Sequence, residues 1–214
     1  MRIPRHIAII PDGNRRWAKG GGMEKHEGYE YGLSPGLECL HLAQKAGVEE
    51  LTYYGFTTDN CKRPQKEVAA FSAACVKAVE MIAQSDVSLL VVGNSESKMF
   101  PKELLRYTGE RVKFGSGKTR VNFLVNYGWE WDLGQMDTNS NSREAITDSL
   151  RSRDISRIDM VVRWGGRKRL SGLLPVQSVY ADIFTIEAMW PDFAPSQFED
   201  ALRWYDRQEV TLGG

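Results

Sequence analysis

Six short runs of β-branched, aromatic and other apolar residues constrain the fold of this chain more than any other feature. Several are apolar at nearly every position, which is typical of strands buried on both faces of a parallel sheet. Helix-compatible segments lie between them, and the clearest of these span 34–46 and 65–84. The alternation predicts an α/β fold with a central, largely parallel six-stranded sheet flanked by helices. The runs span 6–10, 51–56, 87–93, 120–128, 158–164 and 182–189.

The length of the chain predicts a single domain over residues 1–214. A chain of 214 residues with 42% hydrophobic content can bury one sizeable core. The polar segment 135–144, QMDTNSNSRE, is predicted to be an exposed loop rather than a domain linker. The segment GSGKT at 115–119 lacks the upstream glycine of a phosphate-binding loop and precedes a strand, so it is predicted to be a turn.

The charge of the chain is balanced, with 28 lysine and arginine residues against 28 acidic residues. A nucleic-acid partner is not predicted, because recognition of a nucleic-acid backbone needs an extended positive surface. Three cysteines without close spacing and the lack of an apolar leader predict a reducing, cytoplasmic location. The longest apolar run, 87–93, is far shorter than the roughly 20 residues that span a bilayer.

Polar and basic residues follow three of the predicted strands directly. Ligands of open parallel sheets bind outside the carboxyl ends of the strands, so these residues are expected to meet at one rim. Gly13 lets the backbone approach a ligand closely, and a helix that begins near Asn14 would direct free N–H groups at an anion. The sequence therefore predicts a local phosphate site. Its candidates are Asp12, Gly13, Asn14, Arg15 and Arg16 after the first strand, Thr57, Thr58, Asn60, Lys62 and Arg63 after the second, and Arg163, Arg167, Lys168, Arg169 and Ser171 at the fifth.

Each of these segments also has an ordinary structural explanation. An Asp-Gly-Asn sequence after a strand is usually a turn with a helix cap, and a short basic run is usually a solvated surface. The chain has neither a Walker-type loop nor a G-x-G-x-x-G loop, so ordinary nucleotide binding is not predicted. The functional explanation gains its weight from the combination of the three segments.

Five motifs resemble the cis-prenyltransferase family, in its order and over nearly the whole chain. They are PDGNRRWA at 11–18, FTTDNCKRP at 56–64, NYG at 126–128, R-x-G-G-x-x-R-L-S at 163–171 and WPDF at 190–193. The best-known members of this family make undecaprenyl diphosphate and dehydrodolichyl diphosphate. The resemblance implies a single α/β domain, usually dimeric, that joins an allylic diphosphate to isopentenyl diphosphate with Mg²⁺. The DDxxD motif of trans-prenyltransferases is absent.

The resemblance also implies roles for single residues. Prenyl transfer needs an allylic C–O bond to ionise, and Asp12 is the candidate magnesium ligand that would stabilise the departing diphosphate. Asn60 and Arg63, the other two expected catalytic residues, match positions beside the allylic diphosphate and the proton lost after condensation. Asp182 stands where relatives carry a glutamate that completes the metal site, often across the dimer. The expected substrate-binding residues are Arg163, Arg169 and Ser171 at the homoallylic diphosphate, Arg16 with the backbone of Gly13 and Asn14 at the allylic diphosphate, and Arg15, Trp17, Lys25, Tyr29, Thr57 and Thr58 around them.

Several departures from the family motifs bear on the product. Tyr29 replaces a histidine, Arg167 replaces a glutamate, and Trp129 and Glu130 replace the glycine and arginine that follow NYG. Thr211 or its neighbour replaces a C-terminal arginine, which implies the loss of a contact across the dimer. A fixed cation at position 167 would favour tight or reoriented binding of the acceptor diphosphate. The reaction is therefore expected to stop after one condensation or to change the attacking carbon.

The sequence leaves the product and the assembly open. The segment between 128 and 163 is shorter than in long-chain members, which favours a short or medium product, and the apolar stripe on 65–84 is either a tunnel wall or plain core. One alternative is irregular condensation onto dimethylallyl diphosphate, giving a lavandulyl-type product. Another is a non-catalytic or co-catalytic subunit of a heteromeric cis-prenyltransferase. The expected partners are prenyl diphosphates and a second copy of the chain, with a heteromer as the alternative and peripheral membrane contact through a lipid product.

Overall fold

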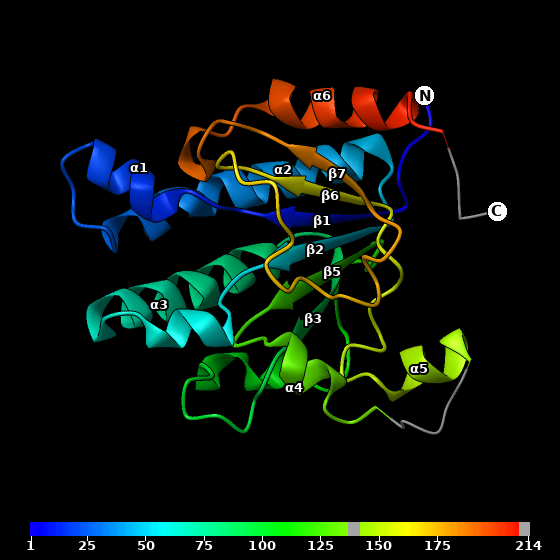
Figure 1. Ribbon diagram of the computed structural model, residues 1–214, viewed down its shortest axis with the longest axis horizontal. Coiled ribbons are helices and arrows are strands. Elements are labelled where there is room, and N and C mark those ends of the chain that lie inside the picture. Colours follow the sequence, from blue (N-terminus) through cyan, green and yellow to red (C-terminus); the bar gives the residue numbers. More distant parts are fainter. Residues whose placement is uncertain (137–141, 210–214) are drawn as a thin grey trace.

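The central sheet has seven strands in the order β4-β3-β5-β2-β1-β6-β7. A computed structural model describes residues 1–136 and 142–209 (Figure 1). Neighbouring strands are parallel except for β3 and β4, which are antiparallel. The strands are β1 (His6–Ile10), β2 (Glu50–Tyr54), β3 (Val87–Val92), β4 (Val112–Phe114), β5 (Thr119–Leu124), β6 (Met160–Arg163) and β7 (Asp182–Thr185).

This architecture confirms the predicted α/β fold but corrects the number of strands from six to seven. The additional strand, β4, lies at an edge of the sheet and has only three residues, so it leaves no apolar run in the sequence. The turn predicted at 115–119 joins β4 to β5. Gly115 and Gly117 both have positive φ there, and the amide of Gly117 donates to the carbonyl of Phe114 over 3.1 Å.

The helices also follow the predicted pattern. The segments predicted at 34–46 and 65–84 are α2 and α3, and α2 is capped at its C-terminus by Gly47, which has a left-handed φ of 87°. The α-helices are α1 (Asn14–Gly20), α2 (Leu33–Ala46), α3 (Gln65–Ile82), α4 (Trp129–Leu133), α5 (Arg143–Ser149) and α6 (Pro195–Asp206). Short 3₁₀ helices are η1 (Glu27–Gly32), η2 (Thr58–Lys62), η3 (Lys102–Tyr107) and η4 (Trp190–Asp192).

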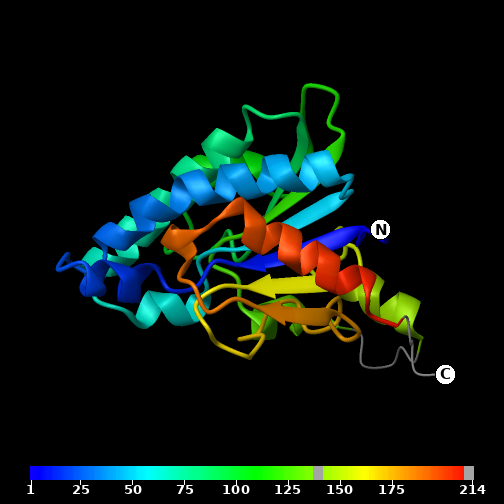
Figure 2. The same ribbon diagram turned by 90° about the horizontal axis from the view of Figure 1, so that it is seen from above.

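The two faces of the sheet have separate hydrophobic cores. Helices α2, α3 and α6 pack on one face, against alternate strand residues such as Ile7, Ile9 and Leu51 (Figure 2). The other face packs against α4 and the irregular segments around 155 and 173. Strands covered on both sides explain the nearly continuous apolar runs of the sequence.

The polar segment predicted as a loop at 135–144 is only partly described. Its last residues begin α5 at Arg143, and the Oγ of Ser142 accepts a hydrogen bond from the amide of Ala145 over 3.1 Å, so this part is a capped helix rather than a loop. Residues 137–141 lie outside the described residues, as does Thr211.

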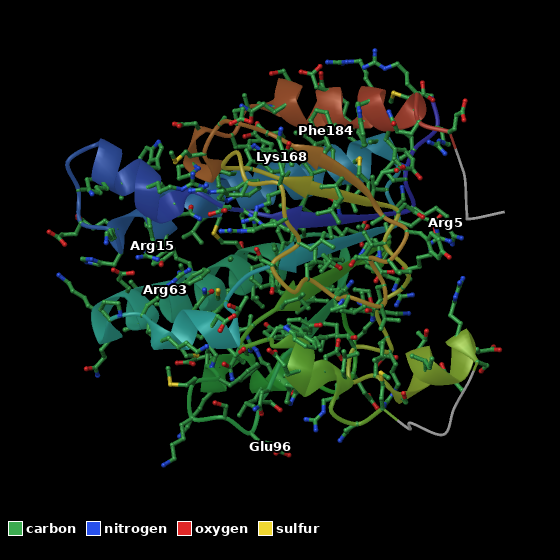
Figure 3. All side chains as sticks on the ribbon, viewed as in Figure 1. Arg5, Arg15, Arg63, Glu96, Lys168 and Phe184 are labelled. Carbon is green, nitrogen blue, oxygen red and sulfur yellow. The ribbon has the colours of Figure 1, made fainter. Side chains whose placement is uncertain are left out.

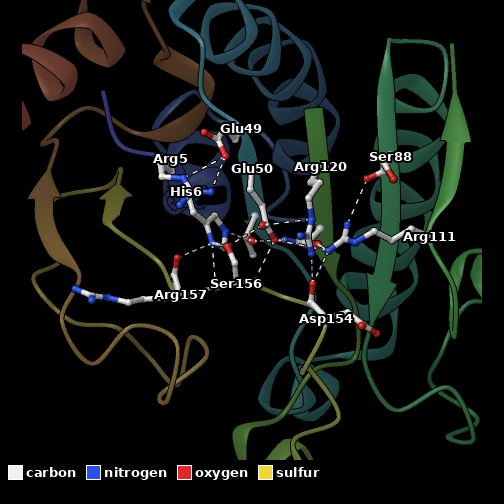
Figure 4. Close-up of polar contacts among 12 residues, drawn as sticks. Arg5, His6, Glu49, Glu50, Ser88, Arg111, Arg120, Asp154, Ser156 and Arg157 are labelled. Atoms are coloured by element: carbon white, nitrogen blue, oxygen red, sulfur yellow. Dashed lines mark hydrogen bonds and ion pairs between the residues drawn. The ribbon is translucent and has the colours of Figure 1, made fainter. Parts of the chain in front are cut away.

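The two edges of the sheet carry different groups. Figure 3 shows Arg15 and Arg63 beyond the carboxyl ends of the strands, between α1 and α3, and Arg5 at the opposite, amino edge. The amino edge holds a buried polar network (Figure 4). There Glu50, 3% exposed, accepts hydrogen bonds of 2.7 Å from Asn122 and from Ser156.

Candidate active site

The segment after β1 places Asp12 and a left-handed glycine at the carboxyl edge of the sheet. Gly13 has φ 108° and precedes α1, which begins at Asn14 as predicted. A Cβ atom at Gly13 would lie 2.9 Å from the Cβ of Met189, closer than real Cβ atoms approach. Glycine is therefore needed at position 13 for two reasons: it adopts the left-handed backbone conformation, and it lets the backbone pack closely on the segment after β7.

Arg163 is the buried centre of the candidate site. It is the last residue of β6, lies beside Ile10 in the register of β1, and is 4% exposed. Its Nη2 donates to Oδ2 of Asp12 over 2.7 Å, and its Nη1 donates to Oγ of Ser171 over 3.0 Å and to the carbonyl of Arg169. A buried guanidinium needs such partners because an unpaired charge in the interior is strongly destabilising.

Arg16 lies on the other side of Asp12. Its Nη2 is 3.5 Å from Oδ1 of Asp12 and donates to the carbonyl of Gly165 over 2.8 Å. A Cβ atom at Gly165 would lie 2.6 Å from this nitrogen, so glycine at that position leaves the room that Arg16 occupies. Asp12 thus stands between two guanidinium groups, those of Arg16 and Arg163, that are far apart in the sequence.

The segment after β2 is ordered by its own side chains. Thr57 and Asn60 form reciprocal hydrogen bonds of 3.3 and 3.0 Å that begin η2. Arg63 follows η2, and its Nη1 donates to the hydroxyl of Tyr29 over 2.9 Å. The ring of Tyr29 stacks on Phe71 with centroids 4.4 Å apart. Burial raises the pKa of Tyr29 and Arg63 only partly opposes this shift, so the phenol stays neutral.

These segments surround a cavity of about 530 Å³. Its size is that of a small-molecule site, and its charge is strongly positive. Arginine and lysine side chains of this kind bind phosphate oxygens through charge-assisted hydrogen bonds. The acidic lining residues are Asp12 and Asp59, and the basic ones are Arg15, Arg16, Lys19, Lys25, Arg63, Arg163, Arg167 and Arg169.

Most of the predicted site residues line this cavity, and five do not. The indole of Trp17 points elsewhere and donates to Oδ1 of Asp192 over 2.7 Å. Thr58 packs against Gly128, where a Cβ atom would lie 2.7 Å from its Oγ1. The others are Lys62, Lys168 and Asp182. The predicted residues that line the cavity are Asp12, Gly13, Asn14, Arg15, Arg16, Lys25, Tyr29, Thr57, Asn60, Arg63, Arg163, Arg167, Arg169 and Ser171.

Asp182 lies at the wrong end of its strand to join Asp12 in one chain. In the register of β6 and β7 it is opposite Met160, whereas Thr185 is opposite Arg163. Asp182 and Thr185 are three residues apart on β7, which corresponds to about 10 Å along the strand. The register therefore places Asp182 away from Asp12 within one chain, and the expected metal site of Asp12 and Asp182, which relatives often complete across the dimer, stays a prediction.

Sequence reasoning missed seven residues that line the cavity: Ile10, Pro11, Lys19, Tyr54, Gly55, Asp59 and Phe71. Lys19 could have been found, because it lies three and four positions after Arg16 and Arg15 on the same helix face. Asp59 stands inside a motif already identified. Tyr54 and Phe71 look like core residues in sequence, and only the packing shows that they also face the site.

A family model described as putative undecaprenyl diphosphate synthase matches residues 10–213. The chain belongs to this family. The match spans every segment of the cavity and confirms the resemblance seen in the motifs. A member of the undecaprenyl diphosphate synthase family is a prenyltransferase, and the family reaction is cis-prenyl condensation.

Individual relatives agree with this assignment. The (2E,6E)-farnesyl-diphosphate-specific ditrans,polycis-undecaprenyl-diphosphate synthase of Yersinia pseudotuberculosis is 31% identical over 231 residues, covering 100% of this chain and 91% of the relative. The enzyme of the same name from Pasteurella multocida is 27% identical over 229 residues, covering 99% and 95%. The structure of lavandulyl diphosphate synthase from Lavandula x intermedia, in complex with dimethylallyl diphosphate, has a TM-score of 0.86 at 20% identity and covers 99% of each chain. The last comparison confirms the fold.

Among residues 1–136 and 142–209, no group of three or more histidine, cysteine, aspartate or glutamate side chains could hold a metal ion. Within the part of the chain that the structure describes, no helix combines the length and the apolar character needed to cross a membrane.

Proposed function

We propose that this prenyltransferase joins an allylic prenyl diphosphate to isopentenyl diphosphate, releases diphosphate, and uses Mg²⁺. The observation that supports this best is the position of Asp12 between Arg16 and Arg163 at the centre of a basic cavity. Two diphosphates have to lie side by side for one prenyl group to pass between them. Asp12 contacts a guanidinium group on each side, so we place it at the boundary between two diphosphate-binding sites.

The residues present fit a magnesium ion held largely by its substrates. Mg²⁺ is commonly bound through one or two carboxylates together with substrate phosphates. The Asp12 side chain is 31% exposed, so part of it faces the cavity even while Arg163 holds Oδ2. When bound, the ion would neutralise charge that develops on the departing diphosphate.

We assign the donor to the half of the cavity next to α1. Arg16, Lys19 and Lys25 supply its positive charge, and Arg63 closes it from the side of η2. These groups would hold the diphosphate while the allylic C–O bond breaks and the electron pair leaves with the diphosphate. Asn60 and Arg63 would then lie beside the proton that the acceptor loses after the new C–C bond forms.

We assign the acceptor to the half of the cavity formed by the segment after β6. Arg163 and Ser171 are already joined by a 3.0 Å hydrogen bond, and Arg169 lines the cavity beside them. Two guanidinium groups and a hydroxyl can hold a diphosphate that does not ionise. Fixing this group orients the acceptor double bond toward the reacting carbon.

A small apolar cavity supports a short or medium product. It has a volume of about 50 Å³ and lies between α2, α3 and the sheet, lined by apolar side chains such as Leu33, Leu37 and Met81. Pro11 lines both this cavity and the basic one, so the two adjoin. A donor tail would enter there, and a long chain would have to displace side chains of α2 and α3.

A homodimer is the assembly that we propose, with a heteromer as the alternative. The strand β7 lies at the edge of the sheet. Ile183 on this strand is 42% exposed, and Val179, shortly before it in the chain, is 65% exposed. An exposed edge with apolar side chains is a natural surface for a second chain. Equilibrium sedimentation of the purified chain measures the oligomer directly.

The test of the activity is the product profile of the purified protein. It is incubated with Mg²⁺ and each allylic diphosphate from C5 to C20, with and without isopentenyl diphosphate, and the products are identified by mass spectrometry. Products that grow in C5 steps only when isopentenyl diphosphate is present support the proposal. Branched products from dimethylallyl diphosphate alone would show irregular condensation instead. Absence of turnover from every pair would contradict an independently active enzyme.

A further inference from the structure

The turn that carries Ser171 has an unusual backbone. Ser171 has φ 55° and Gly172 has φ 82°, so both are left-handed. For a serine this conformation is strained and persists only where the surroundings hold it. The backbone conformation of the turn also sets the position of Oγ of Ser171, which accepts a hydrogen bond from Nη1 of Arg163. Contacts that fix the turn therefore also fix this hydrogen bond.

Tyr54 and Trp129 hold the turn from two sides. Tyr54 is the last residue of β2 and is 8% exposed, and its hydroxyl donates to the carbonyl of Ser171 over 2.7 Å. A Cβ atom at Gly172 would lie 2.8 Å from Cδ1 of Trp129 and 3.5 Å from the Tyr54 hydroxyl. The ring of Tyr54 packs edge-on against Tyr127 with centroids 6.2 Å apart.

The Tyr54 hydroxyl has a single hydrogen, and the Ser171 carbonyl takes it. Burial raises the pKa of Tyr54 well above its usual value, so the hydrogen stays in place at neutral pH. Tyr54 lines the cavity, but its hydroxyl hydrogen is directed at the carbonyl oxygen of Ser171 in the turn. The influence of the hydroxyl on a ligand therefore passes through the turn.

We infer that Tyr54 is a positioning residue for the acceptor diphosphate, acting through the backbone of Ser171. This inference rests on the proposed function, because it assigns Arg163, Arg169 and Ser171 to the acceptor. The hydroxyl fixes the turn, the turn presents Oγ of Ser171, and Oγ fixes one edge of the Arg163 guanidinium. Tyr54 thereby couples the end of β2 to the loop after β6.

The test is Tyr54→Phe, with KM measured separately for both substrates. The variant loses one neutral hydrogen bond and is expected to raise KM for isopentenyl diphosphate about fivefold. KM for the allylic donor is expected to stay at the wild-type value. The matched control is Tyr53→Phe: Tyr53 is the preceding strand residue, and its hydroxyl donates over 2.7 Å to the carbonyl of Gly36 on the opposite face. The control should show a similar fall in melting temperature and a wild-type KM for isopentenyl diphosphate.

A second pair of variants separates positioning from direct contact. In a Ser171→Ala background, adding Tyr54→Phe should leave KM for isopentenyl diphosphate unchanged, because both changes act on one link. A fivefold effect that persists without the Ser171 hydroxyl would mean that Tyr54 touches the substrate, and would overturn the inference. Equal increases in KM for both substrates, or an equal effect of Tyr53→Phe, would overturn it as well.

Failure of the proposed function has a different signature. It would be seen as wild-type protein that turns over none of the substrate pairs. Calorimetric titration with isopentenyl diphosphate then tests Tyr54 without turnover. A weaker affinity in Tyr54→Phe than in wild type supports the inference, and equal affinities overturn it.

Discussion

Nη2 of Arg163 lies 2.7 Å from Oδ2 of Asp12, and this ion pair joins the ends of the neighbouring strands β6 and β1. The two partners differ in their access to solvent, because the side chain of Arg163 is 5% exposed and that of Asp12 is 31% exposed. Asp12 is therefore the partner that can also serve a ligand in the cavity. Arg163 is the buried partner, and the ion pair with Asp12 compensates the cost of burying its charge.

Asp12→Asn should lower kcat by about 10²–10³-fold while the protein stays folded. Asparagine keeps an acceptor oxygen for Arg163 but loses the charge that would act, through Mg²⁺, on the departing diphosphate. Asp12→Ala should be as inactive and also less stable, since it leaves Arg163 buried beside an unfilled position. Turnover rates and urea unfolding of the three proteins check both statements. Wild-type kcat in Asp12→Asn would rule out the proposed role.

Arg16→Ala and Arg169→Ala should separate the two diphosphate sites. We expect Arg16→Ala to raise KM mainly for the allylic donor and Arg169→Ala to raise it mainly for isopentenyl diphosphate. Each loss of a charge-assisted hydrogen bond corresponds to about 1.5–3 kcal/mol. Lys168→Ala is the control, because Lys168 neighbours Arg169 and does not line the cavity. If both arginine variants affect both substrates alike, the assignment of the two halves is wrong.

Tyr29→His combined with Arg167→Glu should shift the products toward longer, regular chains. Both positions line the basic cavity, and the pair of changes restores a histidine and a carboxylate beside the diphosphates. The two effects should not be additive, because they act on one site. The product profile by mass spectrometry is compared with wild type on the same donor with both C5 acceptors.

The control for this double variant makes the same chemical changes outside the cavity. Tyr31 is 50% exposed and packs on Trp17, and Lys168 is exposed, so Tyr31→His with Lys168→Glu alters charge without altering the lining. An unchanged product profile in the folded Tyr29→His, Arg167→Glu protein would mean that these two positions do not set the product length, and that the small apolar cavity is the next determinant to test.

Acid should destabilise the protein through the buried network at the amino edge of the sheet. Nδ1 of His6 lies 3.0 and 3.2 Å from the carbonyls of Ser156 and Arg157, so this nitrogen carries the hydrogen and Nε2 accepts from Thr52 over 2.7 Å. Burial lowers the pKa of His6 below its usual 6.5, despite the nearby Glu50. The native state therefore resists protonation of a group that the unfolded chain protonates readily.

The sign of the effect follows from this difference in proton binding. Below about pH 6.5 the unfolded state binds more protons than the native state, so the free energy of unfolding falls as the pH falls. Glu50 acts in the same direction: burial would raise its pKa, but the hydrogen bonds from Asn122 and Ser156 and the charge of Arg120 lower it overall, so its contribution is lost as the pH falls below about 4.5. Urea unfolding from pH 8 to 4 measures the slope. His6→Gln should flatten that slope above pH 5.

Much of the candidate site could be predicted because parallel strands end at a common edge. Asp12 and Arg163 are far apart in sequence, yet each lies at or just after a strand end, and neighbouring strands bring them into contact. The same rule identified Arg63 and Ser171. It depends only on the direction of the strands, which the apolar runs indicate.

Side-chain partners inside the site could not be predicted in this way. The hydrogen bond from Arg63 to Tyr29 depends on how η1 packs against α3, and the bond from Tyr54 to Ser171 depends on a left-handed turn at a serine. The strand β4 was missed because three residues at an edge need no apolar run. The position of Asp182 at the amino end of β7 could not be predicted either, because a family motif specifies a residue and not its height along a strand.

The height of Asp182 along β7 has a consequence for the behaviour of the protein in dilute solution. If a metal ion takes a carboxylate from Asp12 and another from Asp182, the register of β6 and β7 means that the second must come from another molecule. Each complete metal centre would then contain two polypeptides. At protein concentrations below the dissociation constant of the dimer, the concentration of complete centres would be proportional to the square of the protein concentration. Turnover per milligram would fall on dilution and recover when an Asp12→Asn chain, inactive by itself, is added to supply the missing carboxylate.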